Sequence, residues 1–222
     1  MDIQLFIIQN KEFFKAFYAL VAILVSVLIV FKSHKLFRLS SHNGIRYFRN
    51  AFFFYGIAFV IRYFLKFFIE ESFIVNAFFE FFLVMAGFFL LYSLLWKRFE
   101  SFAYKPFSSL FNARISLFYA LAVVIVILDF LLKGYYFMFL IQILVFLYAT
   151  ILSYKNYKKD NYKHKFPRFY FLAMLLAFFA WILNALAAVY FEWNPLAMMN
   201  TYLLNSVFFL LFLYGIIKVT RG

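Results

Sequence analysis

The chain has 222 residues, of which 68% are hydrophobic, 27% are aromatic and only 14% are charged. An ordinary soluble domain is about half apolar and roughly a quarter charged, so this composition excludes a water-soluble fold of the usual kind. The net charge of +13 does not indicate nucleic-acid binding, because the basic residues lie in short gaps between apolar runs. We therefore expect an all-α integral membrane protein whose main partner is the lipid bilayer.

Seven apolar runs follow one another along the chain, and each is long enough to cross a bilayer. Because a backbone in hydrocarbon must satisfy its own hydrogen bonds, runs of about 20 apolar residues are predicted to be transmembrane helices. The connections are too short for a soluble domain, so residues 1–222 are expected to form one seven-span bundle. The predicted spans are residues 13–31, 50–69, 73–96, 115–132, 135–154, 169–191 and 196–217.

The basic residues predict the orientation of these spans. Of the 22 lysines and arginines, 17 lie in the gaps after the first, third and fifth spans or at the C-terminus. Arg38, Lys97 and Lys218 are examples. Loops rich in these residues stay in the cytoplasm. We therefore expect a protein of the cell membrane whose N-terminus lies outside the cell and whose C-terminus lies in the cytoplasm. The basic gap from Lys155 to Arg168 is also a candidate site for anionic lipid or a cytoplasmic partner, although orientation alone explains its charge.

The first three spans resemble the last three in one respect. Displacing the chain by 122 residues superimposes them without a gap, and brings together two helical faces rich in small residues, which allow helices to approach closely. These faces consist of Ala173, Ala177, Ala180, Asn184 and Ala187 in the sixth span and of Ala51, Tyr55, Ala58 and Arg62 in the second. The pattern indicates a 3+1+3 parallel internal repeat. The alternative is that two apolar hairpins with basic loops look alike without a repeat.

Strongly polar side chains are rare within the predicted spans. An ionisable group in a bilayer costs several kcal/mol on insertion scales, so its presence favours a functional role with a nearby partner. At 1.5 Å per residue, Arg62 and Glu80 are predicted to lie at similar depths, roughly 10 Å below the outer surface of adjacent spans, where they would form an ion pair. Gln142 is expected to make a helix contact, and Asp129 is expected to be a solvated acid near a helix end.

We expect these side chains to form a polar cluster that faces a cavity open to the outside and binds a ligand. The alternative is that Arg62 and Glu80 only neutralise each other and hold two helices together. The predicted cluster consists of Arg62, Glu80, Asn184 and Asn200, with Asn76 and Asn205 nearby.

No pattern in the sequence indicates catalysis, a metal or a cofactor. Cysteine is absent, which excludes thiolate metal sites, and the three histidines lie in predicted inner loops rather than at matching depths in facing spans. No nucleophile elbow, zinc-protease motif or glycine-rich phosphate loop occurs. We therefore expect a non-enzymatic protein without a cofactor.

The span number, the orientation and the repeat resemble two kinds of architecture. One is that of seven-span receptors and sensory modules, and the other is that of the small carriers of the SWEET and PQ-loop type, although the proline–glutamine pair of the PQ-loop proteins is absent. An architecture alone does not define a function. The first hypothesis is a receptor-like or binding protein; the alternatives are a carrier with Arg62 as its anion site, or a structural subunit of a larger membrane complex. Few glycines and no mid-span proline favour the first over the carrier.

Overall fold

The computed structural model describes residues 8–40, 42–65, 68, 72–99, 110, 113–159, 165–192 and 194–221, and the regular structure in this part of the chain is helical. Seven helices appear there in the order of the predicted spans. Their bounds are α2 Lys11–Ser40, α3 Asn43–Phe64, α4 Ser72–Phe99, α5 Ala113–Leu131, α6 Tyr136–Lys159, α7 Lys165–Val189 and α8 Pro195–Arg221.

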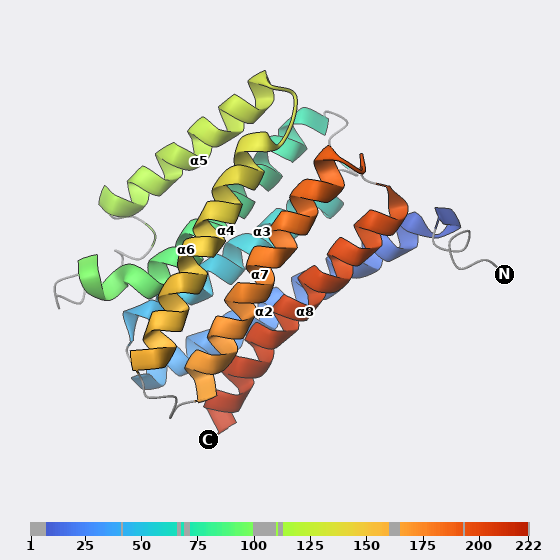
Figure 1. The fold of residues 1–222 in the computed structure, drawn as a ribbon. Coiled ribbons are helices and arrows are strands. Elements are labelled where there is room, and N and C mark those ends of the chain that lie inside the picture. Colours follow the sequence, from blue (N-terminus) through green and yellow to red (C-terminus); the bar gives the residue numbers. More distant parts are fainter. Residues whose placement is uncertain are drawn as a thin grey trace.

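Six of these helices form a closed ring, and α5 lies outside it. α3 packs between α2 and α4, α2 packs on α8, and α7 joins α8 to α6, which closes the ring against α4. Among the described helices, α5 packs on α4 and α6 alone to any extent, and Figure 1 shows it at the edge of the bundle. The end of the bundle at which α2, α4, α6 and α8 begin contains a cavity, and we call it the cavity end. We call the opposite end the basic end, because it carries Arg38, Lys158, Lys159 and Lys218.

The outer surface of the bundle is apolar. Among the described residues, α2, α4, α5, α6, α7 and α8 are long and apolar enough to cross a membrane. The peripheral helix α5 shows this most clearly, since Leu117, Val124 and Ile127 are about half exposed. A surface of this kind is unfavourable in water and favourable in hydrocarbon. The chain therefore has the architecture of a multi-pass helical membrane protein.

Helix α3 differs from the other six and from its predicted span. It covers Asn43–Phe64 rather than residues 50–69, and it is not among the helices apolar enough to be recognised as spans. Its 22 residues still extend about 33 Å at 1.5 Å per residue. Because neighbouring helices cover α3, and residues such as Phe48 and Phe52 are buried against them, it needs less apolar surface than a lipid-facing helix.

A tight turn separates α5 from α6, at the break that the sequence predicts. Lys133 has φ 51°, a left-handed conformation that ends a helix. The amide of Gly134 donates a 3.1 Å hydrogen bond to the carbonyl oxygen of Asp129. A Cβ atom on Gly134 would meet the Tyr136 ring, so a larger residue at this position would require that exposed ring to shift.

Helices α4 and α6 approach closely through one glycine and one amide. Gln142 is buried and its Nε2 donates a 2.9 Å hydrogen bond to the carbonyl oxygen of Leu83. Its side chain occupies the space that a Cβ atom on Gly87 would need. The predicted role of Gln142 as a helix contact is confirmed.

The small-residue faces of α3 and α7 are turned toward the interior. Ala51, Ala58, Ala173 and Ala180 are fully buried, as is Ala177. Two of the helix bounds lie at the offset of 122 residues: α3 begins at residue 43 and α7 at residue 165, while α4 and α8 end at residues 99 and 221. The alanines of both faces are therefore buried inside the bundle.

Candidate ligand-binding cavity

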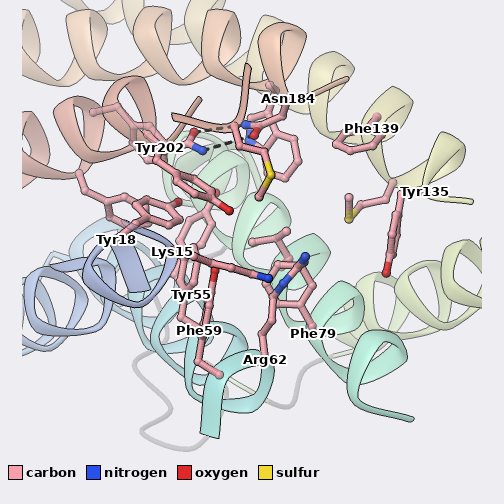
Figure 2. A pocket seen from close by; sticks show the side chains of 18 of the residues that line it. Lys15, Tyr18, Tyr55, Phe59, Arg62, Phe79, Tyr135, Phe139, Asn184 and Tyr202 are labelled. Atoms are coloured by element: carbon pink, nitrogen blue, oxygen red, sulfur yellow. Dashed lines mark hydrogen bonds between the residues drawn. The ribbon is translucent and has the colours of Figure 1, made fainter. Parts of the chain in front are cut away.

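A cavity of about 440 Å³ occupies the cavity end of the bundle. Six helices line it, namely α2, α3, α4, α6, α7 and α8, so it lies inside the ring. Most of its wall is aromatic, as Figure 2 shows for several of the lining rings. These include Tyr18, Tyr55, Phe59, Phe139, Trp181 and Tyr202.

Aromatic side chains close the cavity toward the basic end. Tyr55 and Phe209 line it, with ring centroids 5.3 Å apart. Directly behind them, Phe52 packs on Phe209 at 5.8 Å and on Phe212 at 5.3 Å. Phe52 is fully buried. The cavity is therefore closed by packed rings on this side, whereas Lys11 and Pro195, at the first residues of α2 and α8, line its rim.

Arg62 extends into the cavity from the last turn of α3. Its guanidinium group lies 4.3 Å from the centroid of the Phe79 ring, a cation–π contact that contributes about 0.5–2 kcal/mol. The free carbonyl groups at the end of a helix also favour a cation there. Within the described residues the ion pair that forms at this cavity is Lys15 with Glu12, at 3.7 Å, and no described carboxylate pairs with Arg62.

The predicted ion pair between Arg62 and Glu80 is not present. Successive residues of a helix point about 100° apart, and it is Phe79 that faces Arg62. Glu80 points instead into the contact of α4 with α5 and α6, where it is 3% exposed and lies within hydrogen-bonding reach of Asp129. The two residues lie close along the bundle, as expected, but on different faces of α4.

Asp129 is buried, which corrects the expectation of a solvated acid. Only 1% of its surface is exposed. Its two carboxylate oxygens accept hydrogen bonds of 2.8 Å each from the amides of Phe137 and Met138 in the first turn of α6. A carboxylate at this position satisfies free amides and complements the positive end of the helix dipole. Asp129 thus fixes the start of α6 against the end of α5.

Two of the predicted asparagines meet in the cavity wall. The amide groups of Asn184 and Asn205 hydrogen-bond to each other at 3.3 and 3.4 Å, and Asn184 also donates to the carbonyl oxygen of Ala180 at 2.8 Å. Figure 2 shows this pair on the side of the cavity away from Arg62. Asn76 is half-buried and Asn200 is exposed, and neither lines the cavity. The structure therefore brings together Arg62, Asn184 and Asn205 of the predicted cluster, with Glu80 behind the wall.

The charge around the cavity is predominantly basic. Lys11, Lys15 and Arg62 line it, against the single acid Glu12 among the described lining residues. Glu12 is 73% exposed at the rim and pairs with Lys15. Figure 2 shows the Lys15 and Arg62 side chains in the same part of the cavity. The site thus has a surplus of positive charge against an aromatic wall.

Comparison with known proteins gives no match. No protein-family model fits the chain, and no curated protein or solved structure is significantly similar to it. The comparisons therefore do not indicate a receptor, carrier or subunit role.

Proposed function

We propose that this protein is a non-enzymatic, receptor-like membrane protein that binds a small organic anion in the cavity. The observation that carries the proposal is Arg62, which enters an aromatic cavity without a described carboxylate partner. A carboxylate ligand would supply the missing partner through two parallel hydrogen bonds, the geometry that a guanidinium group favours. Lys15 adds a second positive charge beside it.

The apolar body of the ligand would be held by the rings of the wall. Tyr18 and Tyr202 stack with centroids 4.5 Å apart, and such rings bury large areas with little loss of conformational entropy. The Asn184–Asn205 bonds are long, so either amide is able to exchange its partner for a polar group of a ligand. A cavity of about 440 Å³ is within the usual range for small molecules. The preferred ligand class is a monocarboxylate with an aromatic body.

The proposed orientation places the cavity end outside the cell and the basic end in the cytoplasm, in the cell membrane. It is supported by the distribution of lysine and arginine, which stay in the cytoplasm in short loops. The ligand would then enter from outside, and the basic end would be available to anionic lipid or a cytoplasmic partner.

A 3+1+3 parallel repeat is part of the same proposal. The offset of 122 shared by two pairs of helix bounds supports it, and so does the packing: exchanging α2, α3 and α4 for α6, α7 and α8 turns the α2–α8 contact into the α6–α4 contact. In this arrangement the cavity lies between two equivalent triplets, with α5 as the link outside them.

Benzoate and its neutral counterpart benzamide test the proposed function on the purified full-length protein. Trp181 lines the cavity, so its fluorescence reports occupation, and Trp181→Phe identifies that part of the signal. We expect benzoate to bind at least about tenfold more tightly than benzamide, a difference of roughly 1.4 kcal/mol. Arg62→Met is expected to remove this preference, whereas Arg38→Met, at an exposed site of the basic end, leaves it unchanged.

Two results would contradict the proposal. One is benzoate binding that is equal in the wild type and in Arg62→Met. The other is the absence of benzoate-dependent fluorescence change at millimolar concentrations in a folded protein. Accumulation of labelled benzoate in sealed proteoliposomes would favour the carrier hypothesis over the receptor hypothesis. A stoichiometric partner that co-purifies and covers the cavity would favour the hypothesis of a structural subunit.

A further inference from the structure

Two buried acidic side chains lie near each other behind the cavity wall. Glu80 of α4 is 3% exposed and Asp129 of α5 is 1% exposed, and their carboxyl groups are within hydrogen-bonding reach. Two other described acids at this end, Glu12 and Glu192, are exposed. Two like charges in contact and out of water repel each other strongly, so both groups do not stay ionised.

The hydrogen bonds indicate which group carries the proton. Both oxygens of Asp129 accept amide hydrogens of α6, as an ionised carboxylate requires. In Glu80, by contrast, the buried Oε1 has no hydrogen-bonding partner among the described residues. A buried carboxylate without donors is costly, whereas a carboxylic acid that donates its O–H to Asp129 is not.

We propose that Glu80 and Asp129 form a proton-binding site, in which Glu80 holds a proton against ionised Asp129, and that its loading is coupled to anion binding in the cavity. The coupling rests on the proposed function, whereas the proton site rests on the burial of both carboxyl groups and on the hydrogen bonds of Asp129. Protons enter from solvent and bind the Glu80 carboxylate; on release they return to solvent, and no other bond changes.

The charged and titratable neighbours of the pair explain the coupling. Arg62 of α3, Glu80 and Asp129 all act electrostatically on Tyr135, which precedes α6, so the four groups lie in one region. Helix α6 otherwise presents amides to the pair, and its described lysines lie at the basic end. Arg62 packs on Phe79, the residue next to Glu80, and a positive charge near a carboxyl group favours its ionised form. An anion bound to Arg62 neutralises that charge, so anion and proton binding strengthen each other.

A second, mechanical link acts through α6. Ionised Glu80 would repel Asp129, which holds the first turn of α6 through Phe137 and Met138. Met138 and the nearby Tyr135 line the cavity. Loss of the proton from Glu80 is therefore expected to move the part of the cavity wall that the start of α6 forms. The cavity shape in this structure then corresponds to the state in which Glu80 is protonated.

Infrared spectroscopy of the full-length protein tests the proton site without any ligand. At neutral pH we expect a C=O stretch of a protonated carboxyl group that shifts in D₂O. The band should disappear in Glu80→Gln and remain in Glu192→Gln, which changes an exposed acid at the same end. Its absence from the wild type, or its persistence in Glu80→Gln, would overturn the proton site whether or not the protein binds anions.

The pH dependence of benzoate binding tests the coupling. We expect the dissociation constant to rise with pH over the range in which the infrared band is lost, by up to about tenfold per pH unit, the limit for one linked proton. Glu80→Gln should bind benzoate with little pH dependence, because its amide also donates to Asp129. Asp129→Asn should likewise lose the pH dependence. A wild-type affinity that is constant across this range would refute the coupling while leaving the proton site to the infrared result.

Discussion

Removing the Asp129 carboxylate is expected to destabilise the bundle more than any exposed charge change. Asp129→Ala leaves the amides of Phe137 and Met138 without their 2.8 Å acceptors in a site from which water is excluded. An unsatisfied buried donor costs roughly 1–3 kcal/mol, so two of them correspond to about 2–4 kcal/mol after partial relaxation. Asp129→Asn keeps one acceptor oxygen and is expected to lose about half of this.

Unfolding in mixed micelles with increasing dodecyl sulfate, followed by circular dichroism, measures these differences. Glu12→Ala is the matched control, since it removes an acid at the same end that is 73% exposed and makes a single ion pair. Exposed pairs contribute at most about 1 kcal/mol, so this variant should unfold close to the wild type. A free energy of unfolding for Asp129→Ala within about 0.5 kcal/mol of that control would refute the role of Asp129 as the anchor of α6.

Three further outcomes follow from the packing. Gly87→Val places a side chain where Gln142 lies and is expected to cost about 1–3 kcal/mol by overpacking, measured by the same unfolding assay; wild-type stability would contradict the close α4–α6 approach. Ala180→Leu, at a fully buried site, should also lower the free energy of unfolding by about 1–3 kcal/mol. An unchanged unfolding midpoint would mean that this face of α7 does not pack against other helices. Tyr202→Ala should weaken benzoate binding about tenfold by removing the ring that stacks on Tyr18, while Tyr202→Phe should not, and equal effects of the two would show that the ring is not used.

The order and helical state of the elements follow from apolar run length, because hydrocarbon leaves the backbone few alternatives. Helix α4, for example, is predicted at 73–96 and found at Ser72–Phe99. The prediction is poorer for α3, since run length detects helices that face lipid. A helix surrounded by other helices tolerates Arg46 and Arg49 in its first turns, and its bounds therefore do not follow hydropathy.

The candidate site was only partly predictable for a related reason. Depth along a span comes from counting residues, and it correctly places Arg62 and Glu80 near each other along the bundle. The direction of a side chain around the helix depends on how neighbours pack, and it directs Phe79 rather than Glu80 toward Arg62. The sequence around Asp129 contains a local signal for its role, because an acid shortly before a tight turn and a new helix is typical of a group that caps free amides.

The most direct test of the whole account is the side of the membrane on which each end of the bundle lies. The chain has no cysteine, so single cysteines introduce unique labels. Lys133→Cys marks an exposed position of the cavity end, and Lys158→Cys marks one of the basic end. In intact cells, a membrane-impermeant maleimide is expected to label Lys133→Cys at once and Lys158→Cys only after lysis. Labelling of both before lysis, or the reverse order, would contradict a membrane-spanning bundle whose cavity opens to the outside.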